Sequence, residues 1–304
     1  MCAHMPAALP TRRLLLALLI VTIWGSNFVA IKLALHDLPP LLLCTLRFVF
    51  VAIPAVFILP RPAVPVRQLL VYGFSMFGFQ FGFMFLGMKL GVSAGLASLI
   101  LQFQVFVTLG LAVVFLKETV SFLQVAGALT AAAGFLVVGT HTGGDVTLAG
   151  FICLLLAACS WAIGNFTSKR LGPVNPLALV TWGSLPVSAA MAVASLVFEG
   201  PTLIVHSLTH ASLTAFLCTA YTVYFSTHVA YSLWSWLLAR HPATTITPFA
   251  LLVPVFGMLT SALLLGEPLP GWKLAAAALV IAGLTLTVFG PTLARSLVNR
   301  PAQP

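Results

Sequence analysis

The chain repeats a short segment of its own sequence. Residues 161–169, Trp-Ala-Ile-Gly-Asn-Phe-Thr-Ser-Lys, restate residues 24–32, Trp-Gly-Ser-Asn-Phe-Val-Ala-Ile-Lys. A second pair of segments agrees with the first, because Phe-Leu-Lys-Glu118 returns as Leu-Leu-Gly-Glu267. In a hydrophobic chain, two copies of one unit are typical of a transporter with a site between its halves. We therefore expect two equivalent halves.

Long apolar runs separate the few charged residues. Hydrophobic residues make up 61% of the 304 residues and charged residues 6%, against roughly 25% charged in soluble proteins. Each run is long enough for the ~20 residues that cross a bilayer as a helix. We predict an all-α polytopic membrane protein, with one five-helix repeat over residues 14–139 and a second, inverted one over 147–289. The ten expected transmembrane helices are 14–35, 41–59, 69–90, 93–116, 122–139, 147–168, 176–197, 213–238, 244–265 and 272–289.

The distribution of Lys and Arg predicts the orientation of these spans. Ten of the 14 cations lie on one side of the expected membrane, three lie on the other, and Arg47 lies within a span. Positively charged loops face the cytoplasm, so both termini are expected there, in a bacterial inner membrane. Because each repeat has an odd number of spans, the second is inverted relative to the first. The net charge of +9 is then a topology signal, with the lipid bilayer and not nucleic acid as the partner.

Several features resemble a known transporter superfamily. They are the ten spans in two inverted halves, an aromatic-Asn-aromatic signature in spans 1 and 6, and a glutamate that opens the turn after spans 4 and 9. With Pro248 and Pro254 in span 9, they resemble the drug/metabolite transporter superfamily, its EamA-type ten-helix family, and within it the bacterial amino-acid exporters. In the first half, Leu99 and Val105 stand where the equivalent prolines would be. A kink in span 4 therefore stays an open question.

The resemblance implies an exporter of small metabolites. The expected substrates are amino acids, aromatic ones included, carried by alternating access around a central cavity lined by spans 1, 3, 4, 6, 8 and 9. No cofactor is implied, and the cysteines have no metal-ligand spacing. A broad-specificity drug or metabolite exporter is the alternative. A sugar-phosphate or nucleotide-sugar transporter would need clustered cations to hold phosphate, and only Arg47 lies deep within a span.

Neutral polar and aromatic side chains mark the expected substrate site. In span 8, polar residues recur at steps of three and four along one face of an apolar helix; they are Tyr221, Tyr224, His228 and Ser232. Such residues suit an aqueous pocket that bonds an amino or carboxyl group while aromatic rings take the apolar part of a substrate. The other expected site residues are Trp24 and Asn27 in span 1, Phe79, Gln80 and Phe83 in span 3, Ser98 and Gln102 in span 4, and Trp161 and Asn165 in span 6.

Some of these polar residues also have structural interpretations. Asn27 and Asn165 equally suit hydrogen bonds that tie neighbouring helices together. A neutral His228 could bond a neighbouring hydroxyl group, although the polar residues on its face favour the pocket. Arg47 could meet a substrate carboxylate, but we expect its long side chain to extend toward the membrane surface.

Other residues are expected to shape the helices. Gly78 and Gly82, four residues apart in span 3, predict a close approach between helix backbones. Lys32, at the end of a span, is expected to extend toward water. Glu118 and Glu267 are expected to accept backbone N–H groups at the start of the helix that follows each of them.

Acidic residues are expected only at loops or helix ends; they are Asp37, Glu118, Asp145, Glu199 and Glu267. Because intramembrane carboxylates are the usual carriers of coupling ions, we expect transport without a strict need for a proton or sodium gradient. Residues 91–95, Gly-Val-Ser-Ala-Gly, match the nucleophile-elbow pattern, but here they join two spans. An intramembrane hydrolase using Ser93 and His228 is the competing function, and a structural or receptor role is the third.

Overall fold

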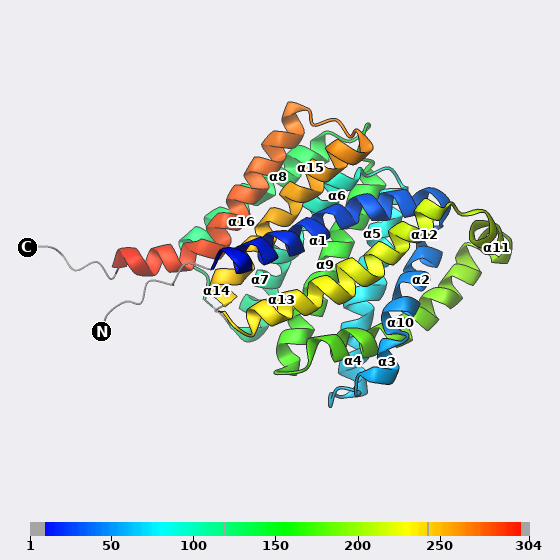
Figure 1. Ribbon diagram of the computed structural model, residues 1–304. Coiled ribbons are helices and arrows are strands. Elements are labelled where there is room, and N and C mark those ends of the chain that lie inside the picture. The colour runs from blue at the N-terminus through cyan, green and yellow to red at the C-terminus, as the bar shows by residue number, and fades with distance from the viewer. Residues whose placement is uncertain (1–9, 118, 242, 299–304) are drawn as a thin grey trace, which may run out of the picture.

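The computed structural model describes residues 10–117, 119–241 and 243–298, which form helices and loops with no strand among them. The helices pack side by side in a bundle, and α1 begins at the same end of the bundle at which α16 ends, on the left of Figure 1. In chain order the elements are α1 (Thr11–Asp37), α2 (Pro40–Ala52), α3 (Ala55–Ile58), α4 (Val66–Gly73), the π-helix η1 (Phe74–Phe79), α5 (Gln80–Lys89), α6 (Ala94–Ile100), α7 (Phe103–Leu116), α8 (Phe122–Thr140), α9 (Leu148–Leu171), α10 (Pro176–Phe198), α11 (Pro201–His210), α12 (Leu213–Ala220), the π-helix η2 (Tyr221–Val229), α13 (Ala230–Leu238), α14 (Ala243–Ile246), the 3-10 helix η3 (Thr247–Leu252), α15 (Val253–Leu265) and α16 (Gly271–Val298).

The apolar runs form membrane-spanning helices. In the part of the chain that the structure describes, 9 helical segments are long and apolar enough to cross a membrane. There are 10 when α11 and the helix over Leu213–Leu238, which meet at a bend of 97°, are counted as one span. The predicted all-α polytopic membrane fold is confirmed.

Equivalent spans of the two halves share the same irregularities. The third and eighth spans each contain a π-helix, η1 and η2, and the fourth and ninth are each interrupted, between α6 and α7 and at η3. Equivalent spans also pack against each other, α2 on α10, α8 on α16 and α6 on α15. Each half is therefore packed largely against the other half.

Three segments differ from the sequence-based expectation. Span 4 breaks at Leu101 and Gln102 without a proline, through backbone hydrogen bonds from Gln102 N to Leu99 O and from Gln104 N to Leu101 O. Span 2 does not continue unbroken, because Pro54 holds the preceding residue extended and ends α2 at Ala52. The connection from 198 to 212 is not a plain loop, since it contains α11 (right end of Figure 1).

The close approach between helix backbones lies elsewhere than at the predicted glycine pair. A Cβ atom at Gly82 would meet nothing within 4 Å, and one at Gly78 would make near-ordinary contacts beginning at 3.3 Å. At Gly73 it would lie 2.3 Å from the carbonyl oxygen of Gly183. Glycine is therefore required where α4 crosses α10, because side-chain atoms would separate the two backbones.

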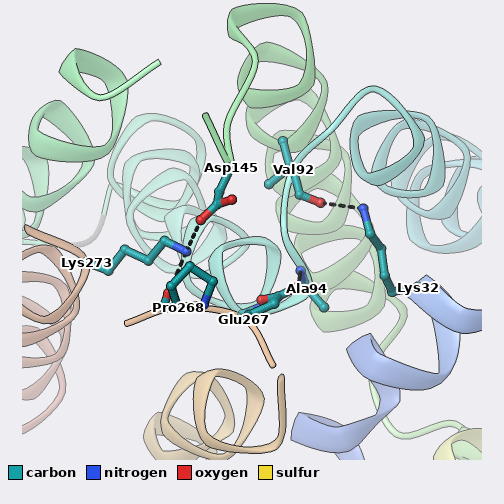
Figure 2. Close-up of polar contacts among 8 residues, drawn as sticks. Lys32, Val92, Ala94, Asp145, Glu267, Pro268 and Lys273 are labelled. Atoms are coloured by element: carbon teal, nitrogen blue, oxygen red, sulfur yellow. Dashed lines mark hydrogen bonds and ion pairs between the residues drawn. The ribbon is translucent and has the colours of Figure 1, made fainter. Parts of the chain in front are cut away.

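Charged side chains bind the backbone of other spans at the end of the bundle away from the start of α1. Lys32 donates to Met88 O at 3.0 Å and to Val92 O at 3.3 Å, so it is tied to its neighbours and does not extend to water. Glu267 accepts from Ala94 N at 2.7 Å and from Gly95 N at 3.0 Å. Figure 2 shows the contact of Lys32 with Val92 and, beside it, Glu267 next to Ala94. The N-terminus of α6 is thus fixed by a carboxylate from the other half.

This finding corrects the expected role of the glutamates. Glu267 does cap a helix N-terminus, but the helix is α6 and not the following α16, because the fold brings the loop after α15 against Ala94 (Figure 2). Glu118 lies outside the described residues. Lys273 bonds Asp145 and the carbonyl of Pro268 beside the same cap.

Candidate functional site

A cavity of about 270 Å³ lies between the two halves. It is bordered by the first, second, third, fourth, sixth, eighth and ninth spans, so each half contributes several of its walls. Its lining residues are Trp24, Asn27 and Phe28 of α1, Arg47 of α2, Met76 of η1, Gln80, Phe81 and Met84 of α5, Ser98 of α6, Leu101 and Gln102 at the break, Gln104 of α7, Trp161 and Asn165 of α9, Ser226 of η2, Tyr231 and Trp234 of α13, Ala250 of η3 and Val253 of α15.

The structure brings together a subset of the expected site residues. Those that line the cavity are Trp24, Asn27, Gln80, Ser98, Gln102, Trp161 and Asn165. The two copies of the repeated Trp and Asn thus face the same space from opposite halves. This arrangement follows from the packing of α1 and α9 around one centre, since both helices contact α6.

The remaining expected residues lie outside the cavity. Phe79 is 50% exposed on the outer surface and Tyr224 is 47% exposed. Phe83 packs on Phe79 and on the apolar core. Tyr221 shares a hydrogen bond of 2.7 Å with Ser26, and Ser232 donates to the backbone oxygen of His228. The polar stripe on span 8 therefore does not line this cavity.

A second polar face on span 8 explains the difference. Thr219, Thr222 and Ser226 also recur at steps of three and four, and all of them are buried. Periodicity identifies which residues share a face but does not say which face points inward. The sequence-based prediction chose the face with the tyrosines. The face with the smaller hydroxyl groups is the one that contributes Ser226 to the cavity, beside Tyr231.

Aromatic rings form one wall of the cavity. The ring centroid of Trp24 lies 5.5 Å from that of Tyr231 and 5.1 Å from that of Trp234. The indole nitrogen of Trp24 donates to Ser226 O at 3.1 Å, which fixes α1 against η2. Such a wall suits the apolar part of a small ligand and the face of a bound cation. Tyr231 and Trp234 had not been singled out from the sequence.

Amide side chains also line the cavity. Asn165 donates to the side-chain oxygen of Gln104 at 3.1 Å, so it ties α9 to α7 as one of its two sequence interpretations proposed. The side-chain oxygens of Asn27 and Gln80 are buried without a hydrogen-bond partner among the described residues. Ser98 donates to Gly95 O within its own helix. Asn27 and Gln80 therefore present free acceptors.

Arg47 is buried beside the same cavity. Its residue is 3% exposed, so the side chain does not extend to the membrane surface as expected. One guanidinium nitrogen, Nη2, donates to Thr227 Oγ1 at 3.1 Å, and the guanidinium carbon lies 4.2 Å from the ring centroid of Phe81. The other two nitrogens, Nε and Nη1, have no partner among the residues that the structure describes.

The described carboxylates are all engaged away from the cavity. Asp37 accepts from Ser212 N, Glu199 accepts from Leu41 N and Leu42 N, and the contacts of Asp145 and Glu267 are those of Figure 2. The Ser93 hydroxyl, the nucleophile of the hydrolase hypothesis, has no hydrogen-bond partner among the described residues. His228 therefore does not activate it.

Family comparison decides the class of this protein. The model of the EamA-like transporter family matches residues 11–140 and again residues 148–289. The chain belongs to the EamA-like transporter family. The double match coincides with the internal repeat. Each half of this EamA-like transporter is therefore one copy of the same family domain.

Curated relatives extend over most of this EamA-like transporter. A Salmonella typhimurium (strain LT2) protein described as a probable amino-acid metabolite efflux pump is 42% identical over 281 residues, 90% of this chain and 94% of that protein. Its Escherichia coli (strain K12) counterpart, described in the same words, is 41% identical with the same coverage. A solved crystal structure shares the fold, with a TM-score of 0.63 and 20% identity over 95% of this chain and 99% of that chain.

Proposed function

We propose that this EamA-like transporter exports amino acids, aromatic ones included, across a bacterial inner membrane by alternating access around the cavity. The observation that carries the proposal is the cavity itself, which combines a few polar side chains with aromatic and apolar walls and is built from both halves. The 42% identical relative, described as a probable amino-acid metabolite efflux pump, supports the substrate class.

The size and charge of the cavity favour a small substrate. Its volume of about 270 Å³ is near the lower end of the ~300–1,000 Å³ that small-molecule sites occupy. A single amino acid suits this space better than the large compounds that a broad-specificity drug exporter carries. Arg47 is the one cation among the lining residues, which disfavours a sugar-phosphate or nucleotide-sugar substrate, since phosphate groups are held by clustered cations.

Unequal packing around the cavity supports alternating access. On the side of Glu267, the residues from Val92 to Gln102 are all buried, whereas those of α7 from Phe103 to Leu109 are half-buried. In the proposed cycle, this structure is the state in which the cavity is closed on the side where Lys32, Glu267 and Lys273 make the contacts of Figure 2. In the proposed cycle these contacts open as the other side closes, through movement of the two inverted halves, residues 14–139 and 147–289.

The orientation follows from the charge distribution. With most Lys and Arg on the side of the termini, both termini are cytoplasmic. The closed contacts of Figure 2 then face the periplasm. Substrate enters the cavity from the cytoplasm in the state described here.

The test is transport by the purified protein in proteoliposomes. We expect efflux of at least one amino acid from a panel of labelled L-alanine, L-threonine, L-leucine and L-phenylalanine, and competition by an excess of the same unlabelled amino acid. Liposomes containing no protein are the control.

The Ser93→Ala variant separates export from the competing hydrolase. We expect it to transport like the wild type, because Ser93 is not among the lining residues and its hydroxyl group makes no hydrogen bond to the described residues. Absence of flux for the entire panel with a folded wild-type protein would refute amino-acid export. Flux abolished by Ser93→Ala at unchanged stability would instead revive the enzyme hypothesis.

A further inference from the structure

The cavity contains buried polar groups whose hydrogen-bonding capacity is unused. Nε and Nη1 of Arg47 are donors without acceptors, while the side-chain oxygens of Asn27 and Gln80 are acceptors without donors. Buried polar groups without partners are rare in folded proteins. Four such atoms on residues that line one cavity therefore point to a ligand.

The arginine is the most costly member of this set. Its guanidinium is charged at any physiological pH, and a buried charge is tolerated when it is paired. Thr227 accepts one hydrogen bond from the guanidinium group, and the Phe81 ring stacks against its face. None of the described carboxylates contacts it, since all of them are engaged elsewhere. An anion of the ligand is the missing partner.

The acceptors lie on the helices that flank the arginine. Asn27 is on α1, Gln80 opens α5 directly after the π-helix η1, and both α1 and α5 contact α2, which carries Arg47. A primary ammonium has three N–H donors, and two neutral amide oxygens supply two of the acceptors it needs. The aromatic face of Trp24 adds a favourable surface for a cation.

We propose that the cavity recognises both charged ends of an α-amino acid, with Arg47 binding the carboxylate and the side-chain oxygens of Asn27 and Gln80 binding the ammonium. This assignment rests on the proposed function and deepens it. The amino-acid side chain then lies against Trp234 and Tyr231. Arg47 sets specificity for the carboxylate, and the amides set specificity for the amine.

Analogues that lack one charged end test the assignment. The labelled substrate is whichever of L-leucine and L-phenylalanine the wild type transports faster. The competitors for leucine are isoamylamine, which lacks the carboxylate, and 4-methylpentanoate, which lacks the amine. Phenethylamine and 3-phenylpropionate are the corresponding pair for phenylalanine. We expect wild type to prefer the full amino acid by at least about tenfold over either analogue, because a hydrogen bond to a charged group is lost in each case.

Two variants should change this preference in opposite ways. Arg47→Met should weaken amino-acid binding by about tenfold or more and make the amine analogue compete as well as the amino acid. Gln80→Met should leave the preference over the amine but reduce the preference over the deaminated acid, because Asn27 remains as the second acceptor for the ammonium. Replacing a buried ionic group by an apolar side chain of similar volume is often neutral or stabilising, which offsets the lost contacts with Thr227 and Phe81, so the melting temperature of Arg47→Met should not fall.

Arg240→Met is the matched control, because Arg240 also stacks on an aromatic ring, that of Trp236 at 4.3 Å, but does not line the cavity. It should retain the wild-type ratios. If Arg47→Met kept the wild-type ratio of amino acid to amine, the assignment would be wrong while amino-acid export stood. If wild type transported no amino acid of the panel, the proposed function would fail first.

Discussion

At the scale of single residues, two tyrosines on neighbouring faces of span 8 have different surroundings. Tyr224 is 47% exposed on the outer surface of a membrane-spanning helix, where lipid covers it. Tyr231 lines the cavity, where the proposed function requires water and substrate to reach it. Exposure of a side chain in a membrane protein therefore does not by itself mean contact with water.

Cysteine substitution distinguishes these two environments. In a background without the native cysteines, we expect Tyr231→Cys to react with a water-soluble thiol reagent and Tyr224→Cys to stay unlabelled, although Tyr224 is the more exposed in the isolated chain. The measurement is the labelled fraction of protein in membranes, with and without a transported amino acid. Labelling of Tyr224→Cys alone, with protection by substrate, would return the site to the polar stripe first predicted.

Residue types in the site were easier to predict than their orientation. The repeated Trp and Asn of the two halves were found because the repeat itself marked them. Arg47 was misjudged, since the length of its side chain allows it to reach the surface and only the surrounding fold shows that it does not. The free acceptors of Asn27 and Gln80 likewise depend on which neighbours lack hydrogen-bond donors, a property of packing that a sequence pattern does not contain.

At the scale of the helices, a carboxylate caps the short helix that borders the cavity. Glu267 binds the first backbone N–H groups of α6, and Glu199 binds those of α2 in the same manner, with two contacts each. A negative charge at a helix N-terminus satisfies free donors and favours the helix dipole. The two caps are chemically equivalent, but only α6 ends in the break at the cavity.

This equivalence gives a matched pair of variants. Glu267→Gln and Glu199→Gln should each lower the free energy of unfolding by about 0.5–2 kcal/mol, measured by thermal unfolding in detergent. Transport per folded molecule should fall in Glu267→Gln, because the position of α6 sets the cavity wall. It should fall less in Glu199→Gln, because α2, which carries Arg47, has 13 residues and is also held by its packing on α10. Equal loss of transport in both variants would show that capping acts through stability alone.

Sequence spacing indicated a cap at Glu267 but not its partner. The sequence-based prediction assigned Glu267 to the helix that follows it, because a sequence shows which residues are adjacent along the chain but not which are adjacent in the fold. The break in span 4 was open for a similar reason, since turns at Leu101 and Gln102 replace the prolines seen in span 9. The cap depends on a contact between the halves, and the break depends on local backbone hydrogen bonds that no proline marks.

At the scale of the whole molecule, the charges are concentrated at the ends of the spans. Each described carboxylate binds a backbone or Lys group at the ends of helices. Arg47, a cation, is the charged residue at the cavity. Binding of an inorganic coupling ion beside Arg47 is thus disfavoured, and the usual carboxylate carrier of such an ion is missing among the lining residues.

Flux should therefore continue without an ion gradient. In proteoliposomes with equal pH and sodium on both sides, we expect amino acids to move down their own gradient at a rate that a protonophore leaves within about twofold. The remaining titratable candidate is His228, which lies outside the cavity. Accumulation against the amino-acid gradient that is driven by a pH step and lost in His228→Gln would overturn this expectation.

Hydropathy and charge predicted the helical membrane fold because the bilayer constrains span length and loop charge directly. They did not predict α11, whose 10 residues are shorter than a span and leave no separate signal within a ~19-residue window. The π-helices η1 and η2 also escaped prediction, since they arise where a helix adapts to its neighbours.

The contacts at the end of the bundle away from the start of α1 join charged side chains mainly to main-chain atoms. Lys32 binds the carbonyls of Met88 and Val92, Lys89 binds that of Leu35, and Glu267 binds the N–H groups of Ala94 and Gly95. A backbone carbonyl or N–H group remains available as a partner when the side chain of the same residue is substituted. Substitutions at these partner positions can therefore accumulate during evolution without loss of the contact, as long as the lysines and the glutamate remain. A fold held in this way therefore depends on few side-chain identities at this end of the bundle.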